Sequence, residues 1–170
     1  MKSLTEKIYY AAGPGDIVTT FRHWRQGEDD PRQFARTYSR QFFDVAESRD
    51  LQALVVSTGG PEDQEEGNGI SVRNRPLPVA RPGLFGFLSR QFVSAFRLWK
   101  DLLQFRPQVA VIAEGTTYWA LIAPLRLFGI RLVPSIHCVL WAPEMKRSRA
   151  KKVVDGIESI SLRLVSNECL

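Results

Sequence analysis

The sequence contains few of the features that would mark a disulfide-rich, metal-binding or membrane-spanning protein. Its 170 residues include only two cysteines, Cys138 and Cys169, which lie far apart and in no spacing typical of a zinc site. Two isolated thiols fit a reducing compartment and argue against a disulfide scaffold. No apolar run approaches the ~18 residues that a membrane span needs. The first residues lack the apolar core of a signal peptide, so we expect a cytoplasmic protein.

Complete phosphate-binding motifs are also missing. No G-x-x-x-x-G-K-[ST] occurs, which excludes a P-loop ATPase at the level of the motif. The segment Gly13-Pro14-Gly15-Asp16 begins like the dinucleotide fingerprint G-x-G-x-x-G, but Val18 stands where the third small residue is needed. Ser57 and Thr58 stand where an acidic residue would hold the ribose. NAD binding is therefore not expected. The loop either lets a ligand approach backbone N–H groups near a helix start or is a turn that needs a flexible backbone.

Length and charge set broader limits. A chain of this length is expected to form one domain with a substantial core. The net charge of +5 and the pI of about 9.5 favour acidic partners: phosphorylated small molecules, anionic membranes or nucleic acid. A solvated basic surface without a partner is the alternative interpretation.

Apolar patterning predicts strands and helices that alternate along the chain. The expected strands are Lys7–Ala12, Leu51–Ser57, Ile70–Arg75, Val109–Ala113 and Arg131–Ile136. The expected helices are Ile17–Gln26, Arg32–Arg49, Leu84–Phe105 and a further one that stops at Gly129. This alternation predicts an α/β fold with an open, mostly parallel sheet and helices on both faces.

More local predictions concern helix faces and connections. The apolar face of Arg32–Arg49 is predicted to comprise Phe34, Tyr38, Phe42 and Val45. The core-facing stripe of Leu84–Phe105 is predicted to comprise Leu88, Phe92, Ala95, Phe96, Trp99, Leu102 and Leu103. The expected connections are an acidic loop at Glu62–Gly69 and an extended linker from Pro76 to Pro82. After the basic segment Lys146–Lys152, the expected elements are a helix at Val153–Ser161 and a strand at Leu162–Ser166.

Polar groups follow the two strands in the stretch from Pro107 to Trp141, which has the order of a right-handed βαβ unit. Such groups collect at the carboxyl edge of open α/β sheets, where ligands bind. His137 would follow the second strand, where it could bond sugar hydroxyls, act as an acid or base, or be structural. Glu114 could orient a ligand hydroxyl or be a solvated loop acid. Cys138 points to the opposite side of an extended chain from His137, so a nucleophile–base pair is not expected.

Four short motifs together resemble the N-terminal Rossmann-like domain of GT-B glycosyltransferases, particularly family 4. Tyr10–Asp16 looks like that domain's first strand with its glycine loop, although Gly-Pro-Gly replaces the usual double glycine. Arg106–Val109 is similar to the family's "(R/K)PDVV", and Gly129–His137 is similar to "G-(I/V)-P-x-V-x-T-x-H". Leu164–Glu168 looks like the "(V/A)-S-(E/N)" strand that precedes the crossing to the second domain. The resemblance spans nearly the whole chain.

The resemblance implies that residues 1–170 are the acceptor-side half of a GT-B fold. The enzyme would transfer a sugar from a nucleotide-sugar co-substrate to a glycan, lipid-linked or small-molecule acceptor. A C-terminal domain that this sequence does not include would hold most of the donor, no metal or other cofactor is required, and the chain alone is expected to be inactive. The residues implied to line the cleft are Gly13, Gly15, Asp16, Glu114 and Thr116, with His137 nearest the transferred sugar.

The residues alone also suggest one other function and one further partner, and they argue against a third function. The glycine loop and the basic surface would also suit a non-catalytic nucleotide- or phosphate-binding module. RNA binding is not expected, because no RRM, KH or OB signature is present. Peripheral contact with an anionic membrane, at its inner face, is the further partner prediction. The residues proposed for it are Phe85, Phe87 and Leu88 with Arg81, Arg90 and Arg97, although the apolar ones also suit a core.

Overall fold

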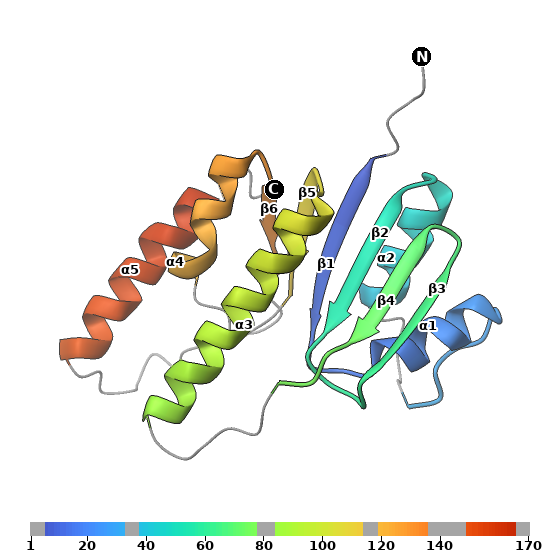
Figure 1. Ribbon diagram of the computed structural model, residues 1–170, viewed down its shortest axis with the longest axis horizontal. Helices are drawn as coiled ribbons and strands as arrows, with labels where there is room; N and C mark the ends of the chain where they lie inside the picture. The colour runs from blue at the N-terminus through green and yellow to red at the C-terminus, as the bar shows by residue number, and fades with distance from the viewer. Residues whose placement is uncertain (1–5, 33–37, 78–83, 114–118, 136–148, 166–170) are drawn as a thin grey trace.

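A computed structural model describes residues 6–32, 38–77, 84–113, 119–135 and 149–165 (Figure 1). These residues form a six-stranded sheet in the order β3-β4-β2-β1-β5-β6. The parallel strands are β1 (Lys7–Gly13), β2 (Gln52–Ser57), β4 (Ile70–Asn74), β5 (Val109–Ile112) and β6 (Arg131–Pro134). The edge strand β3 (Asp63–Gly67) runs antiparallel to β4. The predicted α/β class and mostly parallel sheet are confirmed.

The order of the parallel strands reverses at β1. In chain order, the strands β1, β2 and β4 extend to one side, whereas β5 and β6 extend to the other. Tyr10 of β1 pairs with Val55 on one side and with Val111 on the other. The point between β1 and β5 is therefore a topological switch point, where ligands bind in open α/β sheets.

Helices cover both faces of the sheet, as predicted (Figure 1). The helices α1 (Ile17–Arg25) and α2 (Tyr38–Ser48) pack over β4 on one face. The other face carries α3 (Leu84–Phe105), α4 (Trp119–Ile122), the 3₁₀ helix η1 (Ala123–Phe128) and α5 (Arg149–Val165).

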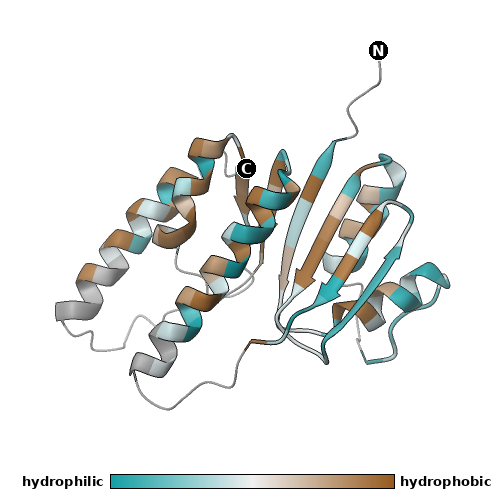
Figure 2. Cartoon of the chain, in the orientation of Figure 1, coloured by the Kyte–Doolittle hydropathy of each residue, from teal (hydrophilic) through white to brown (hydrophobic). Residues whose placement is uncertain are grey.

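Alternate side chains of each central strand belong to two separate hydrophobic clusters. On β1, Tyr9 and Ala11 are buried in the cluster on the α3 side, while Tyr10 is buried on the α1 and α2 side. Figure 2 shows hydrophobic residues along β2 and hydrophilic residues along β3. The central strands read as apolar runs because both of their faces are covered.

The prediction of a loop at Glu62–Gly69 is wrong, because Asp63–Gly67 form β3. The hairpin turns at Asn68 (φ 51°) and Gly69 (φ 75°), and an Asn-Gly pair with both φ angles positive is favoured in two-residue hairpin turns. Ion pairs also stabilise the strand, because the Glu65 carboxylate accepts from Arg22 and Arg25 of α1 at 3.1 Å each. Backbone pairing and these surface ions order a segment that has no apolar residue.

The predicted strand at Leu162–Ser166 is also wrong for the residues that the structure describes. α5 begins at Arg149, continues through the predicted helix and ends at Val165. Ser161 and Val165 are buried four residues apart, which is a helical interval, and the Ser161 hydroxyl donates to the Ile157 carbonyl (2.8 Å). Helical packing therefore overrides the strand-like alternation of Leu162 and Leu164. The helix stop at Gly129 is confirmed, with φ 77° at the end of η1.

The predicted helix faces are partly wrong. On α3, Ala95 and Leu102 are buried as predicted, but Phe92 and Phe96 are 58% and 72% exposed, and Leu103 is exposed as well. The buried side of α3 instead contains Leu98 and the polar residues Gln91, Ser94 and Asp101. On α2, the buried residues are Phe43 and Ala46, whereas Tyr38 and Val45 are exposed. Phe42 packs as predicted, because it lies against the cluster on this side of the sheet and stacks on Tyr10 with ring centroids 4.9 Å apart. The packed face of α2 is therefore formed by Phe42, Phe43 and Ala46.

Candidate functional site

The candidate site is the carboxyl edge of the sheet at the switch point, where the loop Gly13–Asp16 follows β1. Gly13 has φ 75° and ends β1 at an irregularity in its pairing with β2. Its carbonyl accepts hydrogen bonds from the Thr58 N–H (3.0 Å) and the Ser57 hydroxyl (3.0 Å). The start of the loop is therefore fixed to the end of β2.

Ser57 organises the glycine loop. Its hydroxyl is fully buried, accepts from the Gly59 N–H (3.0 Å), and lies within bonding distance of the Gly13 and Gly15 carbonyls. The Gly15 N–H points to the same oxygen at 3.4 Å. A dinucleotide-binding domain would place an acidic residue near this position. In this chain a serine holds the loop instead.

Two glycines after β2 permit this close packing. A Cβ on Gly59 would lie 2.5 Å from the Gly15 nitrogen, and a Cβ on Gly60 would lie 2.7 Å from the Asn74 amide nitrogen. By contrast, a Cβ on Gly15 would meet no atom within 4 Å. The glycine loop is thus packed against the β2 loop on one side and open on the other. The open side of Gly15 is where a ligand could approach the backbone.

The N-terminus of α1 is already capped by protein groups. Asn74, 2% exposed at the end of β4, accepts the N–H groups of Ile17 (3.0 Å) and Val18 (3.4 Å) at its Oδ1. Asp16 Oδ1 accepts the N–H of Thr19 (3.1 Å). An anion-binding helix start needs such N–H groups free to face the ligand. Here the first three of them point to side-chain oxygens.

Asp16, one of the predicted cleft residues, acts as this helix cap. Its carboxylate accepts from the Asn74 Nδ2 (2.8 Å), the Thr19 hydroxyl (2.7 Å) and the Arg32 guanidinium (3.2 Å). Burial opposes ionisation, but these hydrogen bonds outweigh it and hold the pKa of Asp16 well below its ordinary value. The side chain is only 18% exposed. Its oxygens are therefore engaged by the fold.

Arg32 links Asp16 to Asp30, which is buried. Its Nε and backbone N–H donate to Asp30 Oδ1 (3.1 and 3.0 Å), and Asp30 Oδ2 accepts from the Thr20 hydroxyl (3.1 Å). The hydrogen bonds from Arg32 keep the pKa of Asp30 below its ordinary value. This network ties the segment after α1 to the first turn of that helix.

Three predicted site residues, Glu114, Thr116 and His137, lie outside the described residues. The strands that precede them are neighbours in the sheet. Ile112 pairs with Pro134, and the Ser135 N–H donates to the Ile112 carbonyl at 2.8 Å. Within the described ranges, no group of three or more His, Cys, Asp or Glu side chains could hold a metal ion.

Sequence reasoning missed the residues that shape the glycine loop. Ser57 and Asn74 end two strands that were predicted, and each is a polar residue that closes an otherwise apolar run. Their position at a strand end was the only sequence signal of a role at the glycine loop. Their hydrogen-bond partners, Gly15 and Asp16, lie 42 and 58 residues away in the sequence.

The described residues define an α/β protein with a six-stranded, mostly parallel sheet flanked by helices, consistent with a Rossmann-like fold. Comparisons with models of protein families, with curated proteins and with solved structures found no match to this chain. No helix in the described ranges is long and apolar enough to cross a membrane.

The Asp16 cap makes a specific prediction for acid stability. A carboxyl group whose pKa is lowered by folding contributes stability above its unfolded pKa of about 3.9, and this contribution is lost as the pH falls toward the folded pKa. Asp16→Asn removes the titrating group while keeping an acceptor for the Thr19 N–H. The difference between the urea midpoints at neutral pH and at about pH 3 should therefore be smaller in Asp16→Asn than in the wild type.

Glu62→Gln is the matched control, because Glu62 is an exposed carboxylate in the loop after β2. It should keep the wild-type pH dependence of the urea midpoint. An unchanged pH dependence in Asp16→Asn would contradict the assignment of the cap as an ionised carboxylate.

Proposed function

We propose that this chain is the acceptor-side domain of a glycosyltransferase that moves a sugar from a nucleotide-sugar to a glycan, lipid-linked or small-molecule acceptor. The observation that carries the proposal is the switch point between β1 and β5, with the glycine loop Gly13–Asp16 at one of its two strand ends. The motif resemblance to family 4 of the GT-B glycosyltransferases supplies the reaction. A second domain would hold most of the nucleotide-sugar.

The capped start of α1 favours this proposal over a nucleotide- or phosphate-binding module. Such a module would use the free N–H groups of the helix after the glycine loop to bind phosphate. Asn74 and Asp16 already accept the N–H groups of the first turn. A domain that contacts the acceptor and leaves the donor phosphates to its partner domain does not need those groups.

Each residue then has a proposed role. Gly13 and Gly15 present backbone to the cleft, and Asp16 holds the loop in place through its cap. Glu114 and Thr116 contact the acceptor, and His137 lies nearest the transferred sugar. The proposed transfer requires no metal or redox cofactor, and the nucleotide-sugar is its co-substrate.

Gly15→Ala tests whether the open side of the loop is the ligand side. Since the added methyl group meets no atom within 4 Å, the free energy of unfolding should stay within about 0.5 kcal/mol of the wild type. The methyl group would occupy space that a ligand needs, so kcat/KM for sugar transfer should fall about tenfold. The measurement is transfer from a panel of labelled nucleotide-sugars by the protein that carries both domains.

Two further glycine variants are controls. Gly156→Ala, on α5, also adds a methyl group in open space and should leave transfer unchanged. Gly59→Ala places its methyl group against the backbone of Gly15 and should lower stability. Full activity in Gly15→Ala would remove this loop from the site. Absence of transfer from every nucleotide-sugar in the wild-type protein would overturn the proposed function.

A further inference from the structure

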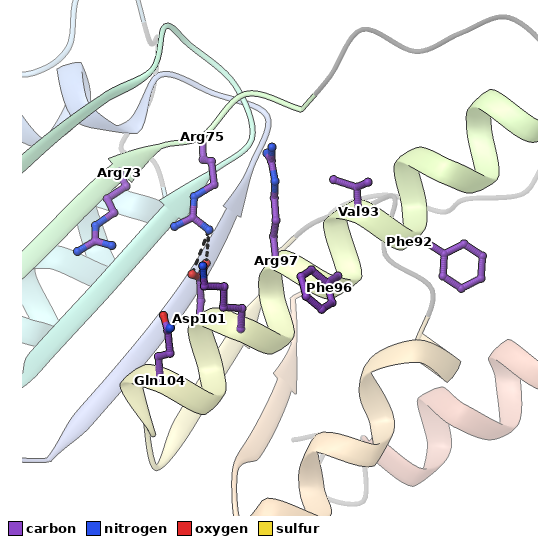
Figure 3. Close-up of a pocket in the computed structure, with 9 residues that line it drawn as sticks. Arg73, Arg75, Phe92, Val93, Phe96, Arg97, Asp101 and Gln104 are labelled. Atoms are coloured by element: carbon purple, nitrogen blue, oxygen red, sulfur yellow. Dashed lines mark hydrogen bonds and ion pairs between the residues drawn. The ribbon is translucent and has the colours of Figure 1, made fainter.

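An open groove lies between β4 and the exposed side of α3, away from the glycine loop (Figure 3). Its volume is about 710 Å³. On β4, Val72 is buried toward α1 and α2, so the next residue, Arg73, faces the α3 side. The groove is lined by four basic side chains and two phenylalanines: Arg73, Arg75, Arg97, Lys100, Phe92 and Phe96.

Two of the four cations are held by the protein itself. Arg75 Nη1 donates to both carboxylate oxygens of Asp101, at 3.0 and 2.9 Å, and Asp101 is a buried residue of α3. The Arg97 guanidinium donates to the Pro76 carbonyl at 3.1 Å. Among the described residues, Asp101 is the one acid that lines the groove, and its charge is already matched by Arg75.

The other two cations are unmatched in the part of the chain that the structure describes. Neither Arg73 nor Lys100 has a hydrogen-bond or ion-pair partner there. The Nε of Arg73 is buried and lacks an acceptor. A buried N–H without a partner costs free energy, and an anionic oxygen in the groove would supply the missing acceptor. The groove therefore has the chemistry of an anion site.

Exposed aromatic side chains stand beside these cations. Phe92 and Phe96 are one helical turn apart on α3, and they are 58% and 72% exposed. In Figure 3, Phe92 points away from the helix and the sheet. Adjacent exposed phenyl rings next to unpaired basic groups are typical of helices that lie in a membrane interface.

We propose that this surface docks on an anionic phospholipid bilayer. Lipid phosphate groups bind at Arg73 and Lys100, and the rings of Phe92 and Phe96 enter the boundary between headgroups and acyl chains. An acidic peptide would match the cations but leave the protruding rings in water, whereas a bilayer accommodates both features. This inference goes beyond the proposed glycosyl transfer. It moves the membrane contact predicted from the sequence to described residues further along α3.

Vesicle co-sedimentation of the chain tests the proposal. The protein should sediment with phosphatidylcholine vesicles that contain phosphatidylglycerol, less with pure phosphatidylcholine, and less at high salt. Arg73→Gln and Lys100→Gln should each weaken partitioning about fivefold, because a basic residue near an anionic surface contributes about that factor. Phe92→Ser and Phe96→Ser should each weaken it about tenfold through lost apolar burial.

Variants on the opposite face provide the controls. Arg49→Gln and Val45→Ser remove an exposed cation and an exposed apolar side chain at α2, and both should sediment like the wild type. Circular dichroism establishes that each variant is folded. Equal binding to neutral vesicles, or unchanged binding in the groove variants, would overturn the proposal. Release by inorganic phosphate or by polyglutamate at equal ionic strength would also overturn it, by identifying a free anion or an acidic peptide as the occupant. Because no sugar transfer is measured, the result is independent of the proposed function.

Discussion

Replacing Asn74 with alanine should lower the free energy of unfolding by about 3 kcal/mol, since three hydrogen bonds are lost and one of them is to an ionised group. The variant leaves the N–H groups of Ile17 and Val18 without their acceptor and removes the donor to Asp16. The site is 2% exposed, so water replaces these partners poorly. Urea unfolding followed by circular dichroism, at constant pH, measures the difference.

Two variants show whether the loss comes from the helix cap. Gln64→Ala removes an exposed amide on β3 and should change stability by less than about 0.5 kcal/mol. Asn74→Asp keeps an acceptor for Ile17 and Val18 but places a second carboxylate beside Asp16, so it should also be destabilised at neutral pH. If Asn74→Ala is as stable as the wild type, the start of α1 does not depend on this cap. The capped start of α1 would then no longer count against a phosphate-binding module.

The sequence was sufficient to predict most of the sheet. β1, β2 and β5 are buried on both faces and read as apolar runs, so their positions follow from hydrophobicity alone. β3 has no apolar residue and is ordered by pairing with β4 and by Glu65 contacts to α1. The turn residues Asn68 and Gly69 carried the one local signal of that hairpin.

Helix faces were harder to predict than helix positions. The 22-residue helix α3 carries more apolar residues than one packed stripe can use, so periodicity does not decide which of them face the core. Asp101 is buried because Arg75 and Tyr9 reach it from 26 and 92 residues away. No local pattern contains those partners, and Phe92 and Phe96 are exposed as a consequence.

The candidate site likewise depends on contacts between residues that are distant in the sequence. The glycine loop and the carboxyl edge follow from the order of strands and turns, but the bonds from Ser57 and Asn74 exist only in the folded sheet. These hydrogen bonds change how the glycine motif is interpreted. They occupy the N–H groups that a phosphate would need and hold the loop against the β2 loop, with only the Gly15 side open. The roles of Glu114, Thr116 and His137 stay predictions based on resemblance.

If the proposed function holds, His137→Ala in a protein that also carries the proposed donor-binding domain should lower kcat for sugar transfer about 100-fold, within the range for loss of an acid–base group. The resemblance to family 4 implies that this imidazole lies nearest the transferred sugar, where it could bond a hydroxyl or exchange a proton. In the sequence it lies two residues after Ser135, whose N–H donates to the Ile112 carbonyl of β5 at the candidate edge. The measurement is donor turnover at saturating nucleotide-sugar, so that kcat is separated from binding.

His23 is the matched control, since it is the other of the two histidines in the chain. It lies on α1, with Nδ1 3.6 Å from a carboxylate oxygen of Glu28. His23→Ala should therefore leave kcat unchanged. His137→Gln keeps hydrogen-bonding groups but cannot exchange a proton, so partial activity in this variant would assign His137 to binding the sugar. An unchanged kcat in His137→Ala would remove the residue from the reaction and leave the glycine loop as the site's remaining support.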